Sequence, residues 1–222
     1  FGCFSFDNNK LLAAGEGGIL VTNNYKYYQK AILLSDFGPR LYKSIKLPNF
    51  KNFIETGLGT KYRIHFLAAK IAIIKLKKIN QLNLERKRVF DYFSKKLKSS
   101  KLLIAPKNKL FFTRGGFYGY KVLMKKNKYL DVKKFILILK SKKVDARRTV
   151  TPPLHLTKTF KNGNIKNFFK NYSFKYNSNN LKNSEWFHKN HISFPSFYKK
   201  EHEKIIDEYI RIILSVEKLL KI

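Results

Sequence analysis

Residues 2–22, GCFSFDNNKLLAAGEGGILVT, decide how the rest of the chain is interpreted. Two short apolar runs, Cys3 to Phe6 and Ile19 to Thr22, flank a polar segment that carries Lys10 and ends in a glycine-rich string. This pattern predicts a strand, an exposed loop, a tight turn and a second strand. The first strand would hold the backbone of Lys10, and a partly desolvated amine on such a loop is a good nucleophile. Taken alone, however, Lys10 is equally compatible with a surface lysine of an ordinary hairpin, since lysines occur along the whole chain.

The residues that follow alternate between helical and irregular patterns. Asn23 or Asn24 can cap a helix that reaches about Asp36, because a side-chain oxygen there accepts hydrogen bonds from the free amides of the first turn. Residues 37–61 are broken by Gly and Pro and predict a long loop, a length more typical of functional segments than of simple connectors. From about residue 65 to residue 97, apolar residues recur at steps of three and four, which predicts one long helix with a buried face.

A change of pattern near Ser99 marks a second region. Strands are predicted at residues 102–105, 117–124 and 144–147, and helices at residues 132–142 and 201–220. Residues 149–180 are rich in loop-forming residues. The alternation of strands and helices indicates an α/β fold. We expect two domains, residues 1–98 and residues 99–222.

The composition fits a soluble globular protein, with 44% apolar residues and no uncharged apolar run of the ~20 residues that a membrane span needs. A net charge of +33 suggests a nucleic-acid or anionic-membrane partner. The lysines, however, are spread along the whole chain with abundant Asn and Ile, and no nucleic-acid-binding module is legible. We therefore expect no nucleic-acid partner and no membrane partner.

The cysteine and histidine content adds two further expectations. Cys3 is the single cysteine and cannot form an intramolecular disulfide, which fits a reducing cytoplasm and a thiol in the core. His188 and His191 have a spacing that could bind a metal, but no cysteine and no convincing third ligand accompany them. We expect surface histidines and no metal. The chain also opens inside a predicted strand without Met, so we expect a fragment.

The string from Phe4 to Lys10, followed by Gly15 to Thr22, resembles the cofactor-lysine segment of the DegT/DnrJ/EryC1/StrS aminotransferases. In that family an F-S-F strand leads to the lysine, and a G-E-G-G turn starts the next strand. The resemblance implies that Lys10 carries pyridoxal 5'-phosphate and that the Ser5 hydroxyl binds its phosphate. It also implies fold type I of the pyridoxal enzymes. Residues 1–98 would be the C-terminal part of the large cofactor-binding domain with the long connecting helix, and residues 99–222 the small α/β domain.

A second match covers residues 57–69, GLGTKYRIHFLAA, and resembles the family's segment at the start of its long helix. In that family the loop reaches the active site of the neighbouring subunit, so the resemblance implies a homodimer with shared sites. Lys61 would face the cofactor phosphate of the neighbouring subunit, and Arg63 would bind substrate. A surface charge pair at the start of a helix is the alternative for both residues.

Further matches follow in the family's order. Residues 115–120, GGFYGY, resemble a small-domain strand of the cyclitol-aminating subset, and residues 153–156, PLHL, resemble the family's P-L-H loop. Residues 193–197, SFPSF, resemble the strand before the last helix. These matches imply Tyr118 and His155 as substrate-binding residues, although both are equally compatible with purely structural roles. Thr151 and Phe66 depart from the family's usual residues, which puts the substrate pocket in doubt more than the reaction.

The resemblance implies a transamination in which glutamate or glutamine donates nitrogen to a nucleotide-linked keto sugar or a keto-cyclitol. The pathway would be polysaccharide or amino-sugar biosynthesis in the cytoplasm. In this family the acidic partner of the pyridine nitrogen and the aromatic residue that stacks on the ring precede the cofactor lysine. We therefore expect that a missing N-terminal half is required, and that the fragment alone is inactive.

Three alternatives remain open. A related branch dehydrates sugars with the same cofactor but has histidine in place of the lysine, and Lys10 argues against it. A non-catalytic or regulatory homologue is disfavoured by the intact Ser5, Lys10 and G-E-G-G string, although a missing first half would favour it. A basic nucleic-acid-binding protein would show steep, salt-dependent binding.

Overall fold

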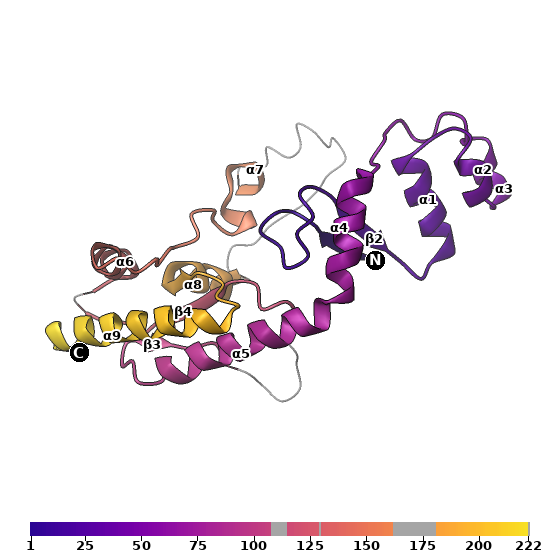
Figure 1. Cartoon of the computed structure of the whole chain (residues 1–222). Helices are drawn as coiled ribbons and strands as arrows, with labels where there is room; N and C mark the ends of the chain where they lie inside the picture. The colour runs from indigo at the N-terminus through magenta and orange to yellow at the C-terminus, as the bar shows by residue number, and fades with distance from the viewer. Residues whose placement is uncertain (108–114, 129, 162–180, 222) are drawn as a thin grey trace. The chain divides into compact units, whose positions relative to one another are not determined.

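The computed structural model describes residues 1–107, 115–128, 130–161 and 181–221 (Figure 1). The chain forms two compact units, Phe1–Leu82 and Asn83–Ile222. This division differs from the boundary expected after residue 98, because Val89, Phe90 and Phe93 lie in the core of the second unit. Among the described residues, no helix has the length and apolar character needed to cross a bilayer.

The first unit begins with the predicted hairpin. Strand β1 (Gly2–Ser5) pairs antiparallel with β2 (Gly18–Val21), and Ser5 lies opposite Gly18. Helix α1 (Tyr25–Ser35) follows, and the Asn24 side chain accepts a hydrogen bond from the amide of Tyr27 at 3.1 Å. The expected cap and helix are confirmed. Cys3 is exposed, so the expectation of a core thiol is wrong; neither face of this two-stranded sheet is covered by the described residues.

The segment expected to be a long loop contains two short helices, α2 (Leu41–Ser44) and α3 (Pro48–Lys51). A small apolar core of Leu33, Leu41, Ile45 and Ile54 holds them against α1. Gln29 of α1 is fully buried in this part of the unit. Its side-chain amide donates to the Tyr25 hydroxyl and the Ser44 carbonyl, and its oxygen accepts from the amides of Lys46 and Leu47 at 2.8–3.0 Å. The segment is therefore closed by polar contacts as well as by apolar burial.

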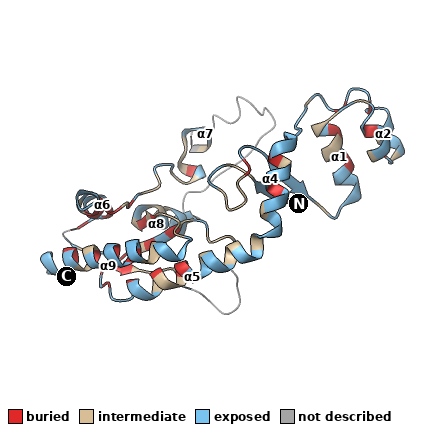
Figure 2. Ribbon diagram, viewed as in Figure 1, coloured by how far each residue is buried: buried red, intermediate tan, exposed pale blue. Residues whose placement is uncertain are grey.

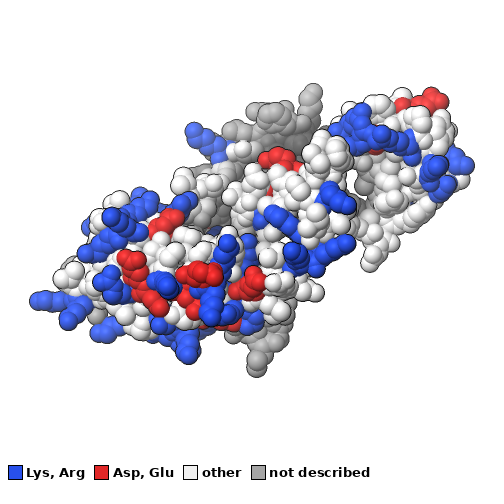
Figure 3. Space-filling model, in the orientation of Figure 1, with Lys and Arg blue, Asp and Glu red and all other residues white. Residues whose placement is uncertain are grey.

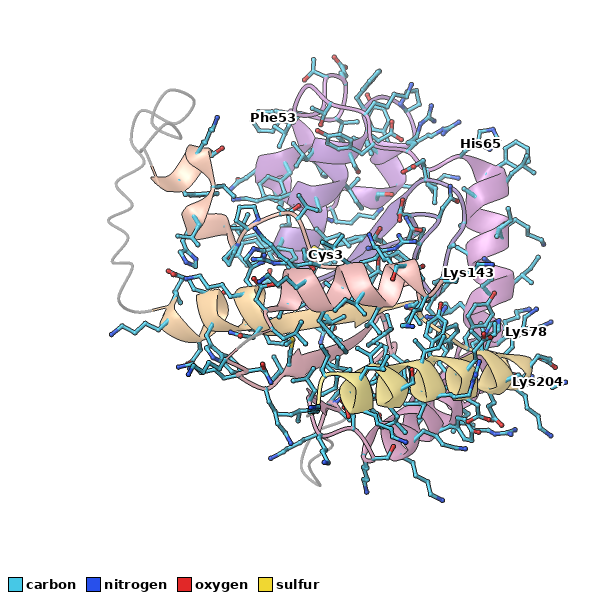
Figure 4. All side chains as sticks on the ribbon, turned by 90° about the vertical axis from the view of Figure 1, so that its left-hand side faces the viewer. Cys3, Phe53, His65, Lys78, Lys143 and Lys204 are labelled. Carbon is cyan, nitrogen blue, oxygen red and sulfur yellow. The ribbon has the colours of Figure 1, made fainter. Side chains whose placement is uncertain are left out.

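The predicted long helix is two helices, α4 (Phe66–Lys77) and α5 (Ile79–Leu97). The break occurs at Lys78, whose amide bonds to the carbonyl of Lys75 at 3.0 Å, a shorter step than the helical one. Apart from Lys70, Lys75 and Lys77, every residue of α4 is apolar, yet only Ala68 and Ala72 are buried (Figure 2). Its side chains stand out from the ribbon between His65 and Lys78, which are labelled in Figure 4. A helix that is apolar on all sides is typical of a buried environment.

The second unit is built around a three-stranded antiparallel sheet in the order β3-β4-β5, with β3 at Leu103–Ile104, β4 at Tyr120–Met124 and β5 at His191–Phe194. Its core also contains residues of α5, of α6 (Val132–Ser141) and of α9 (Glu203–Leu219). The strand expected at 144–147 is reduced to a single bridge between Arg147 and Ser193. The other elements of the described residues are α7 (Lys158–Lys161), α8 (Lys182–Asn190) and the 3-10 turns η1 (Leu154–Leu156) and η4 (Lys200–His202).

A buried carboxylate closes this unit. Glu217 of α9 is 3% exposed and accepts hydrogen bonds from the Ser100 hydroxyl and from the amides of Lys101 and Leu102, the latter two at 3.0 and 3.1 Å. The contacts bind the last helix to the segment between α5 and β3. Buried charges in proteins are stable only when they are hydrogen-bonded in this way.

Candidate active site

Lys10 lies on a loop whose backbone is fixed at several points. The amide of Phe6 donates to the carbonyl of Gly17 at 2.9 Å, and the amide of Ala14 donates to the carbonyl of Phe6 at 2.8 Å. Lys10 itself donates its amide to the carbonyl of Asp7 at 2.9 Å, and its carbonyl accepts from Ala13 at 3.1 Å. The side chain of Lys10 is half-buried. The loop therefore holds the lysine backbone in one place, as the sequence predicted.

Ser5 lies at the start of the same loop. It is the last residue of β1, it is exposed, and its hydroxyl accepts a hydrogen bond from the amide of Asp7 at 3.3 Å. Asp7 in turn accepts from the amide of Asn9 at 3.0 Å. Opposite Ser5, a Cβ on Gly18 would approach the carbonyl oxygen of Phe4 to 2.8 Å, so the G-E-G-G string meets a steric requirement. Ser5 and Lys10 are thus two functional groups on one hydrogen-bonded turn.

The second sequence match packs against the first. Ile64 contacts the turn at Gly17. A Cβ atom added to Gly17 would lie 2.8 Å from the Cδ1 atom of Ile64. Ala68 and Ala72 of α4 form a small core with Ala14, and Phe6 and Leu12 pack around it. Small residues on both sides let the helix approach the loop closely. The start of α4 therefore supports the loop that carries Lys10.

Lys61 and Arg63 lie beside the C-terminal end of α1. The Lys61 ammonium is 5.1 Å from the centroid of the Phe37 ring, and Arg63 Nε is 3.9 Å from a carboxylate oxygen of Asp36. The amide of Tyr62 between them donates to the carbonyl of Ser35 at 2.8 Å. Both cations are exposed, so these contacts are weak. Their expected roles at a neighbouring subunit stay predictions.

Tyr118 and His155 belong to the second unit. Tyr118 is 59% exposed and lies between Phe117 and Gly119, whose φ values of 47° and 71° are in the left-handed region. Such a conformation is costly for Phe117 and must be held by its surroundings, here by packing against Phe90 at 5.4 Å between ring centroids. His155 is buried, and its Nε2 atom is 3.2 Å from a carboxylate oxygen of Glu185. The structure presents Tyr118 outward and pairs His155 with an acid.

The expectation of two surface histidines is wrong for His191, which is only 2% exposed. Its Nδ1 atom is 2.9 Å from the carbonyl of Phe187 and its Nε2 atom 2.9 Å from the Thr149 hydroxyl. Burial is the main cause that lowers its pKa. Across the described ranges, no group of three or more His, Cys, Asp or Glu residues is arranged to bind a metal.

Three polar residues with buried side-chain atoms were not predicted from the sequence. Gln29 and Glu217 are buried and hydrogen-bonded, and the buried Nε atom of Arg148 has no hydrogen-bond partner within the part of the chain that the structure describes. Local patterns could not identify them, because their environments depend on residues distant in sequence. The lysine and arginine side chains are distributed over the visible face of each unit, in agreement with their spread along the sequence (Figure 3).

The profile of the DegT/DnrJ/EryC1/StrS aminotransferase family matches residues 1–211, and the chain belongs to this family. The chain is also 24% identical over 213 residues to an uncharacterized protein of Methanocaldococcus jannaschii, which covers 92% of this chain and 50% of the relative. It thus spans about half the length of the relatives it matches.

Solved structures support the fold. The aminotransferase from Psychrobacter cryohalolentis superposes with a TM-score of 0.77 at 18% identity, over 100% of this chain and 56% of that protein. GDP-4-keto-6-deoxy-D-mannose-3-dehydratase from E. coli, solved with bound hydrated pyridoxal phosphate, gives 0.73 at 21% identity, over 96% of this chain and 54% of that protein. The predicted α/β architecture of fold type I is confirmed.

Proposed function

We propose that the full-length protein is a pyridoxal-phosphate-dependent aminotransferase in which Lys10 carries the cofactor. The observation that carries the proposal is the placement of Lys10 in a family member, on a loop whose backbone is fixed by hydrogen bonds between Phe6, directly after β1, and Gly17, in the turn before β2. The dehydratase branch of the family has histidine at this place. A lysine there supports amino-group transfer over dehydration.

The described residues fit the cofactor. Ser5 offers an exposed hydroxyl that can donate to a phosphate, and Lys10 offers an amine on the same turn. When bound, pyridoxal phosphate acts as the electron sink that labilises the α-proton of an amino acid. With the cofactor in place, the Lys10 amine would move that proton as general base and general acid. Lys61 of the neighbouring subunit would add a cation at the phosphate, as part of a homodimer with shared sites.

The substrates follow from the family and its relatives. Glutamate or glutamine would be the amino donor, and a nucleotide-linked keto sugar or a keto-cyclitol the acceptor. The similarity to an enzyme that acts on a GDP-linked keto sugar supports the first acceptor class. Arg63, Tyr118 and His155 are the proposed substrate-binding residues; Arg63 and Tyr118 are exposed, and His155 is buried. The reaction would serve polysaccharide or amino-sugar biosynthesis in the cytoplasm.

The active site also requires polypeptide beyond these 222 residues. The chain matches only about half of its relatives, and its first unit exposes large apolar side chains on α4, including Phe66 at 72% and Leu76 at 56%. The strands β1 and β2 are exposed as well. Surfaces of this kind are typical of interfaces. We propose that the first half of the fold covers them and supplies the groups that bind the pyridine ring.

Spectroscopy of the full-length protein tests the proposal. Addition of pyridoxal phosphate is expected to give a visible absorbance band that is absent in Lys10→Ala and that bleaches when glutamate or glutamine is added. Lys26→Ala is a matched control, because Lys26 is an exposed lysine of the same unit. A full-length protein that forms no band dependent on Lys10 would be a non-catalytic homologue.

A further inference from the structure

Two adjacent arginines in the second unit have opposite environments. Arg147 is 73% exposed in its side chain, and its Nε and Nη2 atoms donate to the Asp145 carboxylate at 2.7 and 2.9 Å. Arg148 is only partly exposed, and its Nε atom is buried with no hydrogen-bond partner among the described residues. Successive side chains of an extended segment point to opposite faces. Arg148 therefore lies on the face of Ala146, which is fully buried in the core.

The backbone around Arg148 is fixed on both sides. Arg147 and Ser193 exchange two backbone hydrogen bonds, at 2.9 and 2.8 Å. On the other side, the Thr149 hydroxyl is 2.9 Å from the buried His191 ring. A side chain between two such anchors is held in place before any ligand arrives, which reduces the entropy that binding must overcome.

The chain offers Arg148 no carboxylate side chain. All of its 14 Asp and Glu residues lie in the described ranges, and none of them forms an ion pair with Arg148. A buried N–H group without an acceptor is destabilising. Guanidinium groups bind carboxylates and phosphates through two parallel hydrogen bonds, so an oxyanion is the ligand that this site fits.

We propose that Arg148 binds an oxyanion of a substrate. The inference rests on the proposed transamination, which has two sources of such a group: the carboxylate of the amino donor and the phosphates of a nucleotide-linked acceptor. Arg147, whose guanidinium already binds Asp145, takes no part.

The test uses the full-length protein labelled with ¹⁵N-arginine. The Nε–H resonance of Arg148 is identified by its loss in Arg148→Lys, a variant that keeps the charge but not the forked donor. Pyrophosphate represents the nucleotide source and glutarate the donor source. One of the two is expected to shift this resonance to saturation, and Arg148→Lys is expected to weaken its affinity by about tenfold.

Arg147→Lys is the matched control, since it alters the neighbouring arginine and preserves the net charge. It is expected to change the affinity by less than about twofold. The proposal is overturned if neither probe shifts the Arg148 resonance, or if Arg147→Lys weakens binding equally, which would indicate attraction to surface charge alone. If Arg148→Lys is poorly folded, Arg148→Gln identifies the resonance in its place, and the titration of the unaltered protein then decides the question.

Loading of Lys10 with pyridoxal phosphate is measured on the same samples and is expected to be unchanged in Arg148→Lys. If Lys10 takes up no cofactor while the Arg148 resonance shifts, the proposed transamination fails and the oxyanion site stands. If Lys10 is loaded and the resonance does not move, the oxyanion site alone fails.

Discussion

The side chain of Ile64 occupies the space that a Cβ atom on Gly17 would need, with 2.8 Å between that position and Ile64 Cδ1. Gly17 belongs to the turn that follows Lys10, and Ile64 follows the segment that contains Lys61 and Arg63. The contact therefore joins the segment that carries Lys10 to the segment that carries Lys61 and Arg63. The position of the lysine loop therefore depends on the start of α4.

Gly17→Ala is expected to destabilise the first unit more than Gly15→Ala. Both glycines have positive φ, 138° and 93°, so both variants are strained, but only at Gly17 would the new methyl group overlap a neighbour. The difference in the free energy of unfolding is expected to be about 1–3 kcal/mol. Urea denaturation of the two variants measures it. Equal losses would mean that the Ile64 contact yields without cost.

The hairpin was predictable because its signals are local. Asn24 as the cap and the apolar runs on either side of the Gly-rich turn each depend on a few consecutive residues. The exposure of Cys3 was not predictable, since it depends on what covers the sheet and not on the strand itself. The same holds for Lys61 and Arg63, because a motif indicates their importance but not the group that they face.

Gln29→Leu is expected to open the segment that contains α2 and α3. Leucine would leave the Ser44 carbonyl and the amides of Lys46 and Leu47 without their partner, at a cost of about 3 kcal/mol or more. Trypsin cleavage after Lys46 should accelerate accordingly. Lys30→Leu, an exposed position on the same helix, should leave the cleavage rate unchanged. Similar rates for both variants would show that apolar packing alone closes the segment.

Glu217→Ala is expected to destabilise the second unit by about 2–4 kcal/mol, because it leaves the Ser100 hydroxyl and two backbone amides unpaired. Glu208→Ala on the same helix removes an exposed carboxylate 4.0 Å from Arg211 and should cost less than about 0.5 kcal/mol. Thermal unfolding of both variants provides the comparison. A small effect at Glu217 would mean that water replaces the carboxylate.

Stability is expected to depend on pH through His191. Burial lowers its pKa in the folded state below the ordinary value of 6.5, so below that pH the unfolded chain binds more protons. The free energy of unfolding should therefore fall as the pH drops from about 7 to about 5, and it should gain nothing from this residue at higher pH. His191→Gln is expected to flatten this dependence. If the free energy of unfolding of His191→Gln depends on pH as steeply as that of the unaltered protein, other groups cause the dependence.

The second unit shows where sequence patterns stop being informative. The closing helix was predicted from its apolar stripe, and α9 confirms it. Helix α8 was missed, because KNSEWFHKN has no clear apolar period and contains residues typical of loops. The break at Lys78 was missed because apolar residues continue on both sides of it. The hydrogen-bond partner of the His191 Nε2 atom, Thr149, is far away in sequence.

Chemical trapping of the cofactor shows directly which lysine carries it. The full-length protein is incubated with pyridoxal phosphate, reduced with borohydride and digested, and the modified peptide is identified by mass spectrometry. One reduced pyridoxyl phosphate group is expected on Lys10, and it is expected to be lost after prior incubation with glutamate or glutamine. Modification scattered over many of the surface lysines, with no preference for Lys10, would contradict this expectation.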